Sequence, residues 1–107
     1  MDLFKVKDGH YKEALYFFEY NWKVYRDSAL KAGHIKSFRM LRNVRDSSNA
    51  DIVLVTEYHD RASYDKREEY FQPIMKALRP NGAASLNGLK RDQIVSFVGS
   101  FLTEALD

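Results

Sequence analysis

One long amphipathic segment with its own start and stop signals constrains the fold of this chain more than any other feature. The segment follows Asp8-Gly9 and ends at Ala32-Gly33. Its apolar side chains recur at alternating intervals of four and three residues, which draws one stripe along a helix: Tyr11, Leu15, Phe18, Trp22, Tyr25 and Ala29. We expect Asp8 to cap the start of this helix and Gly33 to end it in the left-handed conformation, with Lys31 favourable to the helix dipole.

Strand-like segments flank this helix and recur in the second half of the chain. The pattern of β-branched and apolar residues predicts strands over about residues 2–7, 34–44, 52–59 and 97–106. The basic residues of the second strand are typical of a sheet edge that is protected from pairing with other chains. A polar cluster predicts a hairpin loop at residues 45–51.

A second helical region covers about residues 61–79 and contains Pro73. Because proline removes a backbone hydrogen bond and clashes with the preceding turn, we expect one helix to end near Phe71 and a short turn to begin at Pro73. A loop bracketed by residues 79–82 and 87–88 follows, and a short helix over about residues 89–96 precedes the last strand. The resulting order, β-α-β-β-α-β, predicts an α+β, ferredoxin-like domain with two helices on one face of an antiparallel sheet.

The length and the strand pattern together predict a partner. The 107 residues suffice for one domain, residues 1–107, and are too few for two. A sheet covered by helices on one side should be polar on the other, but the third predicted strand is apolar on both faces: Ile52 and Leu54 on one, Val53 and Val55 on the other. No sequence is left for another layer, so we expect a second copy to pack sheet to sheet in a homodimer.

Several segments are similar to those of small proteins, mostly of unassigned function, in the dimeric α/β-barrel superfamily. The similarity lies in residues 6–9 (VKDG), 21–23 (NWK), 30–37 (LKAGHIKS) and 98–102 (VGSFL), and it spans nearly the whole chain. The resemblance implies two ferredoxin-like protomers whose sheets form a barrel, in a superfamily that includes cofactor-independent monooxygenases and haem-degrading enzymes. Where the similar proteins carry a proline and a histidine just after the tryptophan, this chain has Val24 and Arg26.

The charge and hydropathy patterns bear on the class of partner. The formal net charge is +2, from interspersed basic and acidic residues, and predicts no nucleic-acid partner. The basic residues around the second strand alternate between its faces and form no groove: Lys36 and Arg42 against Arg39 and Arg45. No apolar run reaches the roughly 18 residues of a membrane span. The absence of a signal peptide pattern fits a cytoplasmic protein or an exported one whose leader is trimmed.

The three histidines offer little catalytic or metal-binding signal. The chain has no cysteine, and no histidine has metal-binding spacing, so we predict no metal and no cofactor. His10 and His34 are expected at solvent-facing ends of the first helix. His59 follows Glu57 by two residues on the same predicted strand face, where an imidazole and a carboxylate could form an acid–base pair. We favour the alternative, a hydrogen bond at the surface or at an interface.

The aromatic stripe of the first helix is first of all core, because burial of each large side chain contributes about 1.5–3 kcal/mol. A second interpretation is a ligand pocket between helix and sheet, lined by Trp22, Tyr25 and a strand residue such as Arg39. Three functions stay open. They are a homodimeric domain that binds a small apolar or aromatic molecule, a cofactor-independent monooxygenase-like enzyme that uses residues of these candidate sites, and a structural or regulatory dimerisation module.

Overall fold

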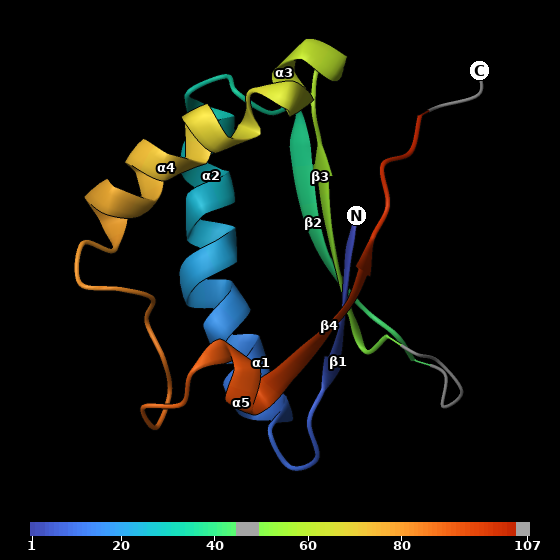
Figure 1. Ribbon diagram of the computed structural model, residues 1–107, viewed down its shortest axis with the longest axis vertical. Helices are drawn as coiled ribbons and strands as arrows, with labels where there is room; N and C mark the ends of the chain where they lie inside the picture. Colours follow the sequence, from blue (N-terminus) through green and yellow to red (C-terminus); the bar gives the residue numbers. More distant parts are fainter. Residues whose placement is uncertain (45–49, 105–107) are drawn as a thin grey trace.

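The computed structural model describes residues 1–44 and 50–104 and contains a four-stranded sheet with helices along one of its faces (Figure 1). The elements in chain order are β1 (Asp2–Val6), α1 (Tyr11–Phe17), the π-helical η1 (Phe18–Trp22), α2 (Lys23–Lys31), β2 (Ser37–Arg42), β3 (Ile52–Glu57), α3 (Arg61–Asp65), α4 (Arg67–Leu78), α5 (Arg91–Ile94) and β4 (Val95–Ser100). Residues 45–49 of the predicted hairpin loop and residues 105 and 106 of the predicted last strand lie outside the described residues.

The sheet is antiparallel throughout, with its strands in the order β2-β3-β1-β4. This confirms the predicted α+β class and the antiparallel sheet, and the strand order is compatible with a ferredoxin-like fold. The position of β2 at one edge agrees with its basic residues. An irregularity in β1 shifts its register against β4, so that Leu3 pairs with Gly99 while Phe4 pairs with Phe97.

Alternation along the strands directs one face of the sheet, the inner face, toward the helices. Phe4, Ile52 and Leu54 are buried on this face and pack with Phe18 and Trp22 of η1. A second core cluster joins α2 to α4 and consists of Tyr25, Ala29, Ile35 and Phe71. In Figure 1, α1, η1 and α2 form one column beside the sheet, and α4 lies alongside α2. The helical column is therefore buried on two sides, by the sheet and by α4.

The ends of the first helical column are only partly as predicted. Gly33 has a φ of +80° and Lys31 lies in the last turn, which confirms the predicted stop. The predicted cap at Asp8 is wrong, because α1 begins at Tyr11 and the residue in the cap position is His10, with no side-chain cap. Gly9, with a φ of +78°, turns the chain between Asp8 and the helix, so the Asp8 side chain precedes the cap position by two residues.

The predicted break at Pro73 is also wrong, because α4 continues through this residue. The interruption lies instead at Lys66, between α3 and α4. Phe71 before the proline is buried, and Ile74 after it packs against the cluster between α2 and α4. Packing on both sides of Pro73 keeps the helix intact despite the missing backbone N–H.

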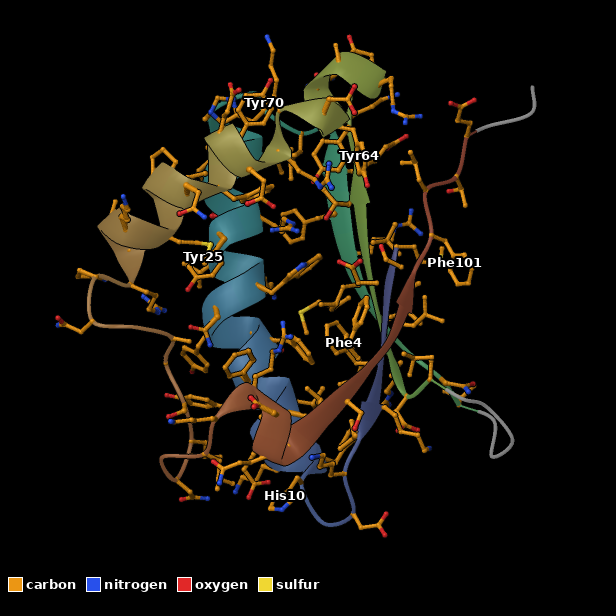
Figure 2. All side chains as sticks on the ribbon, viewed as in Figure 1. Phe4, His10, Tyr25, Tyr64, Tyr70 and Phe101 are labelled. Carbon is orange, nitrogen blue, oxygen red and sulfur yellow. The ribbon has the colours of Figure 1, made fainter. Side chains whose placement is uncertain are left out.

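The outer face of the sheet, which is turned away from the helices, carries apolar side chains. The register places Leu41, Val53 and Leu3 in one row across β2, β3 and β1, with Val55 in the next row. Leu41 is 45% exposed, and Phe101 is 57% exposed and points away from the helices (Figure 2). The predicted split of the third strand into two apolar faces is thus confirmed. No helix in the described part of the chain covers the outer face (Figure 1).

Candidate functional site

The three residues predicted to line one pocket lie in three different environments. Trp22 faces the sheet, and its ring lies edge-on to that of Phe38, with ring centroids 5.8 Å apart. Tyr25 belongs to the cluster between α2 and α4, where burial raises the pKa of its phenol against the opposing charge of Arg79. Figure 2 shows Tyr25 on the side of α2 that is away from the sheet. Arg39 pairs with Val55 on the outer face. The structure therefore does not bring Trp22, Tyr25 and Arg39 together.

Glu57 and His59 do not lie together on one strand face. β3 ends at Glu57, so the placement of His59 on this strand is wrong. The Glu57 carboxylate accepts a hydrogen bond from Ser37 Oγ at 2.8 Å and lies 3.9 Å from Lys36 Nζ. His59 is exposed in the turn before α3. No hydrogen bond or ion pair joins the two side chains within the part of the chain that the structure describes.

Arg26, which the sequence analysis did not select as a site residue, is the centre of a more distinctive arrangement. Its guanidinium carbon lies 3.9 Å from the centroid of the Phe71 ring and 4.9 Å from that of Trp22. Its Nε donates a hydrogen bond of 2.8 Å to Thr56 Oγ1 on the inner face of β3. Aromatic contacts thus come from η1 and α4, and a polar contact from the sheet. We call Arg26 and the residues around it the Arg26 cluster: Trp22, Arg26, Thr56, Tyr58, Tyr64, Arg67 and Phe71.

The guanidinium of Arg26 has free hydrogen-bonding capacity. Among residues 1–44 and 50–104, it makes no ion pair, and the bond to Thr56 is its only hydrogen bond. Its two Nη groups have no protein acceptor there, yet neither is enclosed. Burial lowers the pKa of Arg26, while the phenol of Tyr58 and the carboxylate of Asp2 raise it. The group remains a cation at neutral pH, because an arginine pKa starts far above 7.

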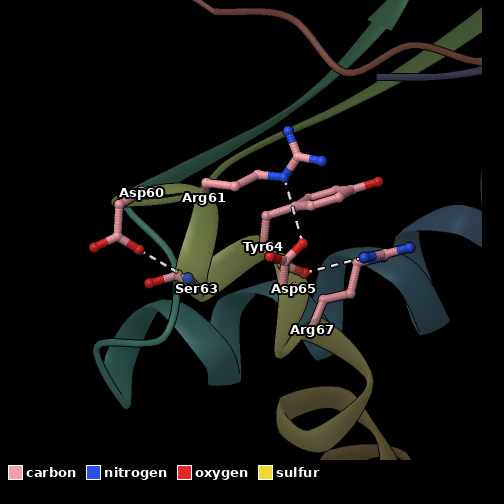
Figure 3. Close-up of polar contacts among 6 residues, drawn as sticks. All are labelled: Asp60, Arg61, Ser63, Tyr64, Asp65 and Arg67. Atoms are coloured by element: carbon pink, nitrogen blue, oxygen red, sulfur yellow. Dashed lines mark hydrogen bonds and ion pairs between the residues drawn. The ribbon is translucent and has the colours of Figure 1, made fainter.

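Two tyrosines and a second arginine extend the cluster beyond the end of β3. The rings of Tyr58 and Tyr64 meet edge to face, with centroids 5.4 Å apart. Figure 3 shows Tyr64 between Arg61 and Arg67, whose guanidinium carbons lie 5.8 and 4.0 Å from the centre of its ring. Burial raises the pKa of Tyr58, and the nearby Arg26 and Arg67 oppose that rise. Tyr58 is therefore a neutral phenol at pH 7 and is able to donate a hydrogen bond.

Arg61 and Arg67 differ in whether a carboxylate balances their charge. Arg61 Nε lies 3.4 Å from Asp65 Oδ1, an ion pair within α3 (Figure 3). Arg67 donates to the backbone oxygen of Tyr64 at 3.0 Å and has no carboxylate partner within the described residues. Arg26 and Arg67 thus act as two positive charges on Tyr58, and the carboxylate of Asp2 acts against them. The net positive charge favours an anion there.

Trp22 adds a buried polar group to the same region. Its Nε1 is enclosed and has no hydrogen-bond acceptor among the described residues. An indole N–H of this kind usually finds a partner when it is buried, and leaving it unpaired costs about 1–3 kcal/mol. The helix–sheet layer beside Arg26 therefore contains an unused donor as well as unused guanidinium edges.

A groove beside the helical column is lined by none of the residues of the Arg26 cluster. Its volume is about 440 Å³, and it runs between α1, η1 and α2 and the edge strand β2. Its walls include Leu15, Glu19, Lys23 and Arg42, together with Arg39. Its charged side chains are one acidic, Glu19, and three basic, Lys23, Arg39 and Arg42, and neither Trp22 nor Tyr25 lines it.

The described residues offer neither a metal site nor a membrane-spanning helix. Within residues 1–44 and 50–104, no group of three or more acidic or histidine side chains is arranged to hold a metal ion. No helix in the same ranges is long and apolar enough to cross a membrane. Comparisons of the chain with protein-family models, curated protein sequences and solved structures give no significant match.

Arg26 gives a weak sequence signal that is clear only in retrospect. It lies four residues after Trp22 on the helix, at the margin of the apolar stripe. A cation at such a position normally extends to solvent. The ring of Phe71 and the hydroxyl of Thr56 come from elements distant in the sequence, and a helical pattern does not reveal them.

Proposed function

We propose that this chain is a homodimeric α/β-barrel domain that binds a small aromatic molecule between its helices and the inner face of its sheet. The proposal joins two parts, assembly through the outer face of the sheet and binding at the Arg26 cluster. Each part has its own support and its own test. The fold is common to both, because one face of the sheet is available to a second protomer while the other carries the binding site.

The apolar outer face supports assembly. Leu3, Val53 and Val55 lie in the middle of this face on the two inner strands, and Leu41 extends the patch onto the edge strand. Charged pairs lie at its border, with Lys5 3.5 Å from Asp51 at one end and Lys36 beside Glu57 at the other. An apolar centre with a charged rim is typical of a protein interface. Two such faces packed together would form the core of a barrel.

The convergence of aromatic rings at the Arg26 cluster is the observation that carries the binding function. The rings of Trp22 from η1 and Phe71 from α4 lie against one guanidinium with free donors. The phenol of Tyr58 interacts electrostatically with this guanidinium, and Tyr64 of α3 meets Tyr58 edge to face. Small-molecule sites combine apolar and aromatic walls with a few convergent polar groups. Ordinary core packing would bury the rings without leaving donors from Trp22 and Arg26 unused.

Trp22 provides a direct test because it is the only tryptophan. A panel of small aromatic compounds is titrated while the emission of Trp22 and the Tm are recorded. We expect at least one compound to change both signals. The same compound should bind more weakly to Tyr64→Leu, and with unchanged affinity to Tyr20→Leu, because Tyr20 stacks on Tyr16, outside the cluster. If no compound changes either signal, the binding function is wrong and a dimerisation module is left.

A further inference from the structure

We propose that the Arg26 cluster is specific for an aromatic carboxylate, whose carboxylate pairs with the free edge of the Arg26 guanidinium and whose ring packs among the surrounding aromatic side chains. This inference rests on the proposed binding function and adds to it the charge and the orientation of the ligand. A site for neutral aromatic molecules would need the rings alone. A site for neutral molecules would give no reason for the partly buried guanidinium of Arg26.

The contacts of Arg26 define which part of its guanidinium remains available. Phe71, with its ring centroid 3.9 Å from the guanidinium carbon, covers a face of the planar group, and Trp22 lies 4.9 Å away. The Nε edge is occupied by the bond to Thr56 Oγ1. The two Nη groups, which have no acceptor in the described part of the chain, form the remaining edge. This edge presents parallel N–H donors, the geometry that a carboxylate accepts with both oxygens.

The charges around this edge favour an anion over a neutral group. Arg26 and Arg67 both act on the phenol of Tyr58 and lower its pKa against the effect of burial. Asp2 on β1, whose carboxylate acts on both Arg26 and Tyr58, makes no ion pair with Arg26 and instead accepts a hydrogen bond from Ser100 Oγ at 2.7 Å. Arg61 and Asp65 neutralise each other. A single negative charge on the ligand would complete the balance, with Tyr58 as an additional donor.

The side chains around the edge determine the remainder of the ligand. Tyr58 and Tyr64 meet edge to face, and Tyr64 is already stacked by Arg67. A flat ring attached to the carboxylate would continue this packing of aromatic and guanidinium planes. An inorganic anion would pair with Arg26 but leave these ring surfaces unused. The free guanidinium edge and the ring surfaces together therefore indicate a ligand that carries both a carboxylate and an aromatic ring.

Matched acids and amides test the inference directly. Isothermal titration calorimetry at low ionic strength measures the binding of benzoate and phenylacetate and of their neutral analogues, benzamide and phenylacetamide. We expect an acid to bind the native chain about 10-fold more tightly than its amide, or better, since charge-assisted hydrogen bonds are about twice as strong as neutral ones. Arg26→Met should abolish this preference. Lys12→Met removes the same charge from an exposed position and should leave the preference unchanged.

The stability of Arg26→Met without ligand separates a binding role from a structural one. Methionine fills a similar length and keeps contact with the rings of Trp22 and Phe71, and it removes a partly buried charge that has no ion pair within the described residues. Its Tm should therefore equal or exceed that of the native chain. A clearly lower Tm would show that Arg26 supports the fold. Arg26→Lys then decides, because lysine keeps the charge but not the paired donors. Loss of the acid preference in folded Arg26→Lys supports the site, whereas an unchanged preference overturns it.

The outcomes for the native chain distinguish the two levels of the proposal. If an acid and its amide bind equally tightly, or if Arg26→Met keeps the preference, the carboxylate specificity is wrong while aromatic binding stands. If neither acids nor amides bind, and no compound of the wider aromatic panel binds, both proposals fail. If neutral compounds of that panel bind and no acid does, only the specificity is overturned.

Discussion

Asn21 shows how one buried amide fixes the position of a loop against the helical column. Its Nδ2 donates to the backbone oxygens of Phe17 and Ala84, at 2.7 and 2.8 Å, and its Oδ1 accepts from the Ala84 N–H at 2.7 Å. The side chain is 3% exposed. Both the donor and the acceptor of the Asn21 amide are therefore used. The two bonds to the backbone of Ala84 resemble those between paired strands, and they hold the loop after α4 against η1.

Replacing Asn21 by alanine should lower the free energy of unfolding by about 1–3 kcal/mol, because the N–H and C=O of the half-buried Ala84 lose their partner. Urea denaturation measures the effect. The control is Asn81→Ala in the same loop, an exposed residue whose replacement should change stability by less than about 0.5 kcal/mol. Equal effects at the two positions would contradict the account of Asn21.

Asp60 caps α3 and makes stability depend on acid pH. Its Oδ1 accepts from the Ser63 N–H at 2.7 Å, and this bond is the main reason that the pKa of Asp60 is lowered (Figure 3). The pKa of Asp60 in the folded chain lies below the unfolded value of about 3.8. The contribution of this charged cap to the free energy of unfolding is therefore fully present above pH 4. It is lost as the pH falls through the lowered pKa.

Asp60→Asn should therefore remove part of the loss of stability below pH 4, since asparagine caps a helix without a titrating group. Thermal unfolding followed between pH 2 and 7 measures this difference. Glu69→Gln is the control, because Glu69 is exposed and makes no hydrogen bond or ion pair within residues 1–44 and 50–104. A native-like acid profile in Asp60→Asn would show that the cap is not the source of the pH dependence.

At the scale of single residues, burial was easier to predict than the neighbour that causes it. The apolar stripe correctly marked Phe18, Trp22, Tyr25 and Ala29 as buried, but its first member, Tyr11, is 38% exposed and Leu15 is only half-buried. It did not show that Trp22 faces the sheet while Tyr25 faces α4, because α4 comes from a distant part of the sequence. For the same reason the sequence did not identify Arg26 as a site residue, because its partner Phe71 is 45 residues away along the chain.

Among the elements, α4 and η1 are the two whose local structure departs from the sequence pattern. The first three strands and the long helix followed from periodicity, since each of these segments alternates between a buried and an exposed side. The last strand was misplaced: β4 begins at Val95, inside the predicted short helix, and ends at Ser100. The π-helical turn gave no signal, because one extra residue in a turn leaves the composition of the stripe unchanged. Pro73 gave a strong local signal that packing against α2 overrides.

Pro73→Ala tests whether packing against α2 outweighs the local cost of the proline. The exposed proline cannot donate to the backbone oxygen of Glu69, so alanine should restore this bond and raise the free energy of unfolding by about 1–3 kcal/mol. Pro80→Ala, in the loop after α4, restores no helix bond and should be neutral or slightly destabilising. Urea titration of both variants decides the matter. A destabilised Pro73→Ala would mean that the ring itself holds α4 in place.

The whole molecule has a two-layer shape with one face left open by the described chain. Its Cα radius of gyration is 14.3 Å, above the roughly 13 Å of a compact domain of about 100 residues. The α+β architecture could be predicted from the order of elements, and the second apolar face from the alternation in one strand. What covers that face could not be read from a single sequence, because the complementary surface belongs to another molecule.

Leu41 offers a way to disrupt the proposed interface with little risk to the fold. It is 45% exposed on the outer face of an edge strand, and Leu41→Lys places a charge there. The charge should shift the chain toward monomer by at least about 10-fold in the dimer dissociation constant, because an uncompensated buried charge is costly at an interface. Leu30→Lys is the control, since Leu30 is 39% exposed on the helical side. It should leave the association unchanged.

Sedimentation equilibrium at micromolar concentration is the most direct test of the central claim that a second copy covers the outer face. The account predicts a mass of twice the 12.5 kDa of the chain for the native protein and for Leu30→Lys. It predicts a lower average mass for Leu41→Lys. A native chain that sediments at 12.5 kDa throughout the micromolar range would contradict it.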